Sequence, residues 1–135
     1  MPNWQSAAPS GGSPTRASRD IPAASALPTP AQATSLILVN YEHHAVASPY
    51  RMRFAIYVRK DEQTFDAVDT VPEQLRRRTL AVRAFDGGAM MVGWELVEGE
   101  KLESTIARCF ADPRSAYLHL HYAAAGCYAA RVERA

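Results

Sequence analysis

The chain changes composition sharply near residue 34, and this change limits how much of it can form a core. Residues 1–34 contain six of the nine prolines, and Pro, Ala, Ser, Gly and Thr fill 24 of these 34 positions. A segment of that composition buries too little apolar surface to offset the entropy lost on ordering its backbone. We therefore predict a disordered tail over residues 1–34 and a single small domain over residues 35–135.

The overall composition excludes several classes of protein. Fifteen basic and fourteen acidic residues leave a net charge of +1, which argues against a strongly basic nucleic-acid binder. The two cysteines, Cys109 and Cys127, form no CxxC motif and no disulfide framework, so we expect them to be reduced. Residues 1–10 lack the pattern of a secretory signal, and residues 115–130 are too few to span a bilayer. We expect a cytoplasmic protein without membrane association.

Three segments in the first half of the domain have the pattern of strands. Residues 35–41 include a short apolar run of strand length. Residues 50–59 alternate between apolar and polar side chains, as in a strand with one face on a core and one in water. Residues 64–70 follow a polar turn and are predicted as the hairpin partner of residues 50–59. Residues 42–49, which include His43 and His44, are predicted as a connector.

The next segments predict a short helix and a second hairpin. Thr70 and Glu73 match the capping-box spacing at the start of a helix that we expect to end near residue 78. Residues 79–85 and 89–97 flank an Asp-Gly-Gly turn, and Gly93 indicates a bulge. Residues 102–110 fit a helix and a strand almost equally well, and we favour a strand because several residues are β-leaning.

The last segment allows two interpretations. Asp112 and Pro113 resemble the start of a helix, which we expect to continue to about residue 133. In the alternative, residues 117–122 form a strand and residues 123–126 form a turn; the proline start and the many alanines favour the helix. The predicted fold is thus a two-layer α+β domain, with an antiparallel sheet of about five strands and a C-terminal helix on one face.

The histidines are the residues most capable of binding a metal ion. On a helix, His119 and His121 lie about 200° apart around the axis and cannot hold one ion. In the alternative strand they share a face, and a metal site becomes possible. His43 and His44 are adjacent in a predicted loop, and adjacent side chains rarely point toward one ion. Because the helix is favoured and no catalytic motif is present, we predict no metal site, no cofactor and no enzymatic activity.

Two surfaces are candidates for binding a partner. The first is the polar face of residues 50–60 with a nearby run of arginines, because arginine and aromatic side chains on an open sheet can hold phosphates and stack bases. Its members are Arg51, Arg53, Tyr57, Arg59, Lys60, Arg76, Arg77 and Arg78. Thr64 and Asp66 on the expected partner strand, and the low net charge, weigh against nucleic acid.

The second surface is the small and apolar back of the predicted last helix. It consists of Ala116, Leu120, Ala123, Ala124 and Cys127. A helix that is apolar all round is usually covered on both sides, so this face predicts a dimer or partner interface. We expect a non-enzymatic interaction or regulatory module that acts through protein–protein contacts, with a homodimer as one form. The alternative is a nucleic-acid-binding accessory domain that uses the arginine and tyrosine face of residues 50–60.

Overall fold

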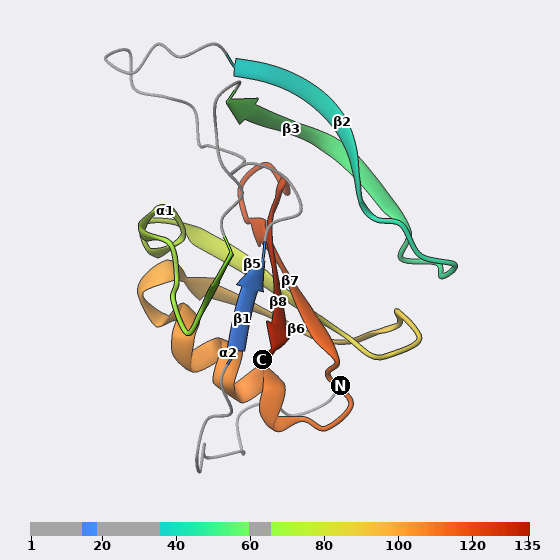
Figure 1. The fold of residues 1–135 in the computed structure, drawn as a ribbon, viewed down its shortest axis with the longest axis vertical. Coiled ribbons are helices and arrows are strands. Elements are labelled where there is room, and N and C mark those ends of the chain that lie inside the picture. Colours follow the sequence, from blue (N-terminus) through green and yellow to red (C-terminus); the bar gives the residue numbers. More distant parts are fainter. Residues whose placement is uncertain (1–14, 19–35, 60–65) are drawn as a thin grey trace.

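The computed structural model describes residues 15–18, 36–59 and 66–135, which form two antiparallel sheets and a few helical segments. The larger sheet has the strand order β4-β1-β8-β7-β5-β6, and the smaller sheet is the hairpin β2-β3, which projects from the rest in Figure 1. The strands are β1 (Thr15–Ser18), β2 (Leu36–His44), β3 (Met52–Arg59), β4 (Asp66–Val68), β5 (Thr79–Phe85), β6 (Met91–Glu98), β7 (Tyr117–Tyr122) and β8 (Tyr128–Arg134). The helical segments are α1 (Glu73–Arg76), the 3-10 turn η3 (Gly99–Lys101) and α2 (Leu102–Ala111). The predicted mixed α+β class is confirmed.

Helix α2 covers one face of the larger sheet and forms the main core with it. The helix buries residues at spacings of three and four, namely Leu102, Thr105, Ile106, Cys109 and Phe110. They pack against strand residues such as Leu80, Val82, Leu118, Leu120 and Val132. The prediction of a strand at residues 102–110 is therefore wrong, because burial of one helical stripe outweighs the modest β preference of individual residues.

The predicted C-terminal helix is also wrong, and the alternative interpretation is correct. Residues 117–122 are strand β7, which pairs with β5 on one side and β8 on the other. Residues Leu118 to His121 alternate between leucine and histidine, as in a strand, and both faces of β7 are buried. Asp112 ends α2 instead of starting a helix, and Pro113 prevents the helix from continuing. Gly126, with φ of +80°, lies in the turn between β7 and β8.

The hairpin β2-β3 covers part of the opposite face of the larger sheet. Ile56 of β3 and Tyr128 of β8 are the buried centre of a second, smaller apolar cluster. Strand β2 continues to His44, so residues 42–44 belong to a strand and not to the predicted connector. The partner of β3 is β2, whereas β4 pairs with β1; the predicted pairing of residues 64–70 with residues 50–59 is therefore wrong.

The β5-β6 hairpin agrees with the sequence prediction, whereas the start of α1 differs from it. Strands β5 and β6 form the expected hairpin, and their register shifts next to Gly93, where a bulge is predicted. Helix α1 is present, but the capping box is not formed, because the Thr70 hydroxyl donates to the Val68 carbonyl and Pro72 occupies the N-cap.

The predicted tail is described only at residues 15–18, which form strand β1 between β4 and β8. The remainder of residues 1–34 lies outside the described residues. Within the described ranges, no helix has the length and apolar character needed to cross a membrane.

Gly99 lies against backbone, so its replacement should cost stability. A Cβ at this position would lie 1.9 Å from the carbonyl oxygen of Leu75, which is backbone that cannot rotate away. We expect Gly99→Ala to lower the free energy of unfolding by about 1–3 kcal/mol or more, measured by urea denaturation. Gly87→Ala is the matched control, because its Cβ would meet nothing within 4 Å. Equal stabilities of the two variants would contradict this packing.

Candidate metal centre

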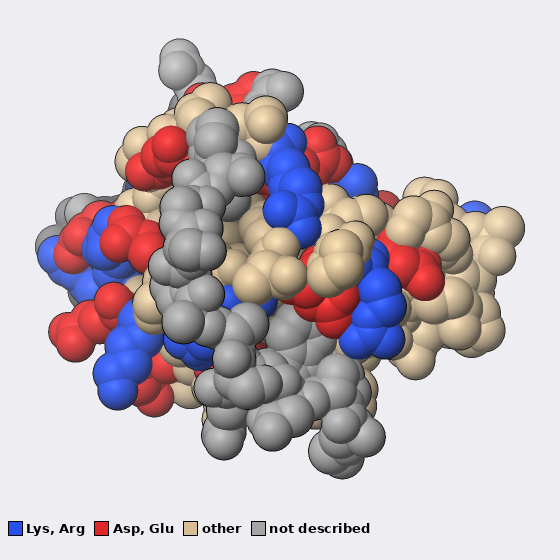
Figure 2. All heavy atoms as spheres, turned by 90° about the horizontal axis from the view of Figure 1, so that it is seen from below, with Lys and Arg blue, Asp and Glu red and all other residues tan. Residues whose placement is uncertain are grey.

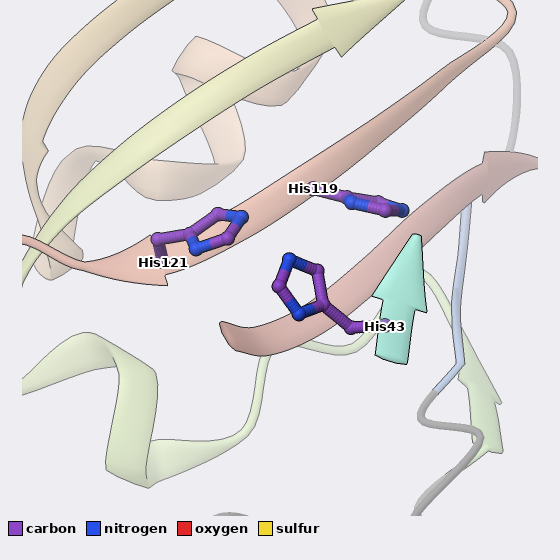
Figure 3. A group of neighbouring side chains, drawn as sticks. All are labelled: His43, His119 and His121. Atoms are coloured by element: carbon purple, nitrogen blue, oxygen red, sulfur yellow. The ribbon is translucent and has the colours of Figure 1, made fainter. Parts of the chain in front are cut away.

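Strand β7 presents two histidines on the face of the sheet that α2 does not cover. His119 and His121 are two residues apart on this strand, so their side chains point to the same side, as Figure 3 shows. Both side chains are 1% exposed. Because β7 is paired on both edges, the backbone that carries these rings is held firmly by its neighbours.

The third histidine of the site comes from the end of β2. The register between β2 and β3 shifts between Tyr41 and His44, where the strand carries an extra residue. A bulge of this kind redirects side chains, and both His43 and His44 are buried next to His119. Their ring centroids lie 6.0 and 4.7 Å, respectively, from that of His119.

The rings of His43, His119 and His121 converge on one point (Figure 3). One nitrogen from each ring lies within 4.8 Å of the others. In a tetrahedral zinc site with bonds near 2.0–2.1 Å, ligand nitrogens are about 3.4 Å apart. Closure of the triad around an ion would shorten these separations by up to about 1.4 Å. We call these three residues the histidine triad.

The hydrogen bonds leave nitrogen atoms of the triad available to a metal. The Nδ1–H of His121 donates to the Gly126 carbonyl at 2.9 Å, so the Nε2 of the neutral ring keeps its lone pair. Hydrogen bonds of this kind orient metal-ligating histidines and fix their tautomer. The Nδ1 of His43 and the Nε2 of His119 are buried and have no hydrogen-bond partner. A buried nitrogen without a partner is costly, and a metal ion would satisfy one that points into the site.

His44 lies beside the triad but has a different role. Its Nδ1–H donates to the Tyr50 carbonyl at 2.8 Å, and its Nε2 accepts from the Tyr117 hydroxyl at 2.7 Å. Both ring nitrogens are therefore occupied, and His44 connects the hairpin to strand β7. Of the two adjacent histidines, only His43 belongs to the triad, whereas His44 bonds to protein groups.

The surroundings keep the triad neutral near pH 7. Burial, with smaller contributions from nearby histidines and Arg83, lowers the pKa of His43 and of His121 to about 4. Burial likewise lowers the pKa of His119 to about 2, with smaller contributions from His44 and His121. A neutral imidazole is the form that binds metals, so protons compete weakly for these nitrogens at pH 7.

The predicted arginine and tyrosine face is only partly assembled. Arg53 and Tyr57 are exposed on β3, as the alternation predicts. The Nε of Arg51 donates to the Glu42 carboxylate at 2.5 Å, and the side chain of Arg59 is half-buried. Lys60 lies outside the described residues. The Asp66 of the expected cross-strand pair is on β4, opposite Ser18, and not beside β3.

The three arginines that were expected to extend this face belong to a different part of the fold. Arg76 and Arg77 pair with Glu103 and Glu73, respectively, and Arg78 lies over the Tyr122 ring at 5.5 Å. Figure 2 shows Lys and Arg side chains interspersed with Asp and Glu on the face seen from below. The described charges there are mixed in sign, and the nucleic-acid hypothesis stays a prediction.

The predicted helix interface does not exist as a surface, because the residues lie on a hairpin and not on a helix. Leu120 is 1% exposed in the main core. Ala123 and Ala124 are in the turn after β7, Ala116 precedes the strand, and Cys127 packs against the smaller apolar cluster. These five residues share no face.

Sequence reasoning missed the triad because it placed His119 and His121 on a helix. The His-x-His pattern was the available signal, and it identifies one face only when the segment is a strand. Local sequence patterns could not predict that His43 lies beside His119 and His121, because this depends on how the β2-β3 hairpin packs against the larger sheet.

The fold is thus an antiparallel α+β domain with three converging histidines on the sheet face opposite α2. The chain belongs to the family described as "Protein of unknown function (DUF1203)", whose model matches residues 21–134. This match begins inside the segment that the composition predicts to be a tail. No curated protein and no solved structure matches the chain.

The stability of the metal-free protein should fall as the pH is lowered from about 6.5 toward about 4. Unfolded histidines take up protons near their ordinary pKa of 6.5, whereas His43 and His121 stay neutral in the fold down to about 4. The unfolded state therefore binds more protons in this window, and the stability that is complete above pH 6.5 is lost on acidification. Each ring contributes a slope of about 1.4 kcal/mol per pH unit.

Urea denaturation across this pH range measures the effect. His121→Gln removes one titrating ring and should reduce the slope by about one proton. A free energy of unfolding that does not change between about pH 6.5 and pH 5 would contradict the burial of neutral histidines.

Proposed function

We propose that this protein binds a divalent transition metal ion, with Zn²⁺ as the first candidate, through His43, His119 and His121. The observation that carries the proposal is the convergence of three ring nitrogens within 4.8 Å of one another. Two of these rings present buried nitrogens without a partner, and the third has its tautomer set by the Gly126 carbonyl. Imidazole suits zinc, copper, iron and nickel, so the donor set defines a class of metals and not one element.

The number of ligands bears on what the ion could do. Closed structural zinc sites have four protein ligands, whereas catalytic sites have three and keep one position open for water or substrate. Within the described residues, the triad supplies three. A zinc ion held by three neutral histidines retains its full charge and can lower the pKa of a bound water to about 7. This proposal replaces the expectation of no metal site, because that expectation rested on the helix that is not present.

The first test is titration of the metal-free protein with Zn²⁺ by calorimetry. We expect one ion per chain. His119→Gln should weaken binding by at least about 100-fold, because even the loss of groups that only orient metal ligands costs 10–100-fold. His44→Gln is the matched control: it is equally buried and adjacent to the triad, but its nitrogens bond Tyr50 and Tyr117 and not the ion, so it should weaken zinc binding far less than His119→Gln.

Metal binding should also stabilise the fold. Zinc at about 100 times its dissociation constant should raise the free energy of unfolding by about 2.7 kcal/mol, and a chelator should reverse the gain. Equal zinc affinity in wild type and His119→Gln, or a stoichiometry that depends on other histidines, would refute the proposed site.

The hairpin favours a second candidate function, a homodimeric interaction module. Ile37, Leu38, Phe54 and Tyr57 are 38–58% exposed on β2 and β3. A two-stranded hairpin is marginally stable unless its faces or edges are covered, and Leu38 and Tyr57 are cross-strand partners on its outer face. A second copy of the chain can offer the same strands in a two-fold arrangement, in which each hairpin covers the other.

This candidate predicts a concentration-dependent mass in analytical ultracentrifugation. Leu38→Lys should shift the protein toward monomer, because it places a charge in the outer face of the hairpin. Leu96→Lys is the control, since Leu96 is also an exposed strand leucine, at 68%, but lies on β6. A monomer at every concentration, or dissociation by the control variant alone, would contradict a dimer through the hairpin.

A further inference from the structure

We propose that the open position of the metal centre binds an organic carboxylate, one oxygen of which contacts the ion while the other contacts Arg83. The inference rests on the proposed metal function and specifies the ligand class of the same site. Its evidence is the position of Arg83, the absence of an acidic partner for that side chain within the described residues, and the aromatic rings around the triad.

Arg83 is placed beside the triad by the sheet register. It lies on β5 directly opposite His119 of β7. Directly opposed residues have Cβ atoms about 4.5–5.5 Å apart and point to the same face. Arg83 is also close enough to His43 and His121 to lower the pKa of both rings. A ligand held at the metal is therefore within reach of its guanidinium.

The guanidinium of Arg83 lacks a strong hydrogen-bond acceptor among the described residues. Its hydrogen bond goes to the Sδ of Met52 at 3.8 Å, and a thioether is a weak acceptor. Other arginines have carboxylate partners, namely Arg51, Arg76, Arg77, Arg108, Arg114 and Arg131. Arg83 is half-buried, and burial lowers its pKa, which shows that the charge is partly removed from water. A buried charge is normally paired, so this one can receive an anion.

The electrostatics of the whole site favour the same ligand. The side chains that lower the pKa values of the three triad rings are histidines, Arg83 and Arg131. Among the described residues no acid acts on these rings, and Arg131 is itself paired with Glu133. A divalent ion with three neutral ligands next to a cation has no negative charge to balance it. An anion that bridges the two would reduce their repulsion and occupy the open coordination position together with the fork of Arg83.

The rings around the triad would give a ligand at the open position an apolar surrounding. Tyr128 stacks on His43 with centroids 4.8 Å apart, and Phe85 lies 5.2 Å from His119. Aromatic walls with a few placed polar groups are typical of sites for organic ligands. A guanidinium fork binds carboxylate and phosphate alike, so the choice between them rests on the apolar rings. The structure therefore favours a carboxylate over inorganic phosphate.

The test uses the full chain loaded with Co²⁺, whose visible absorption reports its ligands. The probes are benzoate and inorganic phosphate. Benzoate should change the spectrum of the loaded protein, and Arg83→Gln should weaken that response at least about tenfold, the scale of one charge-assisted contact. The same variant should bind Co²⁺ as well as or better than wild type, because it removes a neighbouring cation.

Two further variants keep the test decisive. Arg53→Gln is the matched control, since it removes an exposed arginine of the hairpin and should leave the benzoate response unchanged. Arg83→Lys serves in its place if Arg83→Gln fails to fold. Lysine keeps the charge but not the planar fork, so its response to benzoate should lie between those of wild type and a variant without the charge.

The outcomes separate this inference from the metal proposal. If Co²⁺ produces no ligand-field spectrum, the metal proposal fails and the carboxylate site fails with it. If Co²⁺ binds but benzoate has no effect, or acts equally on Arg83→Gln, only the carboxylate inference is overturned. A response to phosphate that exceeds the response to benzoate would overturn the choice of a carboxylate.

Discussion

Strand β7 is the constraint on which the rest of the structure depends, because both of its faces are used. Leu118 and Leu120 point toward α2 and complete the main core, while His119 and His121 point to the opposite face. The same backbone hydrogen bonds to β5 and β8 hold both sets of side chains. The candidate metal centre is therefore built directly on a strand that is paired at both edges, where ligand positions can be fixed closely.

The histidine triad is assembled from two different sheets. Two ligands belong to the central strand of the larger sheet, and the third, His43, belongs to a hairpin that covers it. The bulge in β2 turns His43 inward, and His44 ties the same segment to Tyr117 and Tyr50. A metal ion would join the hairpin to the sheet, so that binding and the packing of this face are coupled.

The neutrality of the triad and the position of Arg83 have one physical origin. Burial beside aromatic rings disfavours charged imidazole, which leaves the ring nitrogens free to bind an ion near pH 7. The same burial makes a positive charge on Arg83 costly without a partner. No described acid offsets these charges near the triad, so a bound anion would strengthen the binding of a cation. Metal and ligand are thus expected to bind more tightly together than separately.

The sequence by itself determined the features that depend on local patterns: the mixed α+β class, the β5-β6 hairpin with its bulge at Gly93, and the strand character of residues 35–41 and 50–59. It also established that His119 and His121 could share an ion only if they lay on a strand. Tertiary structure decided that they do, because the pairing of β7 with β5 and β8 outweighs the helix signals of Asp112, Pro113 and the alanines. It likewise decided that residues 102–110 are a helix and that β3 pairs with β2. Most of all, it brought His43 to within reach of residues more than seventy positions later, since contacts between distant segments depend on packing that no local pattern encodes.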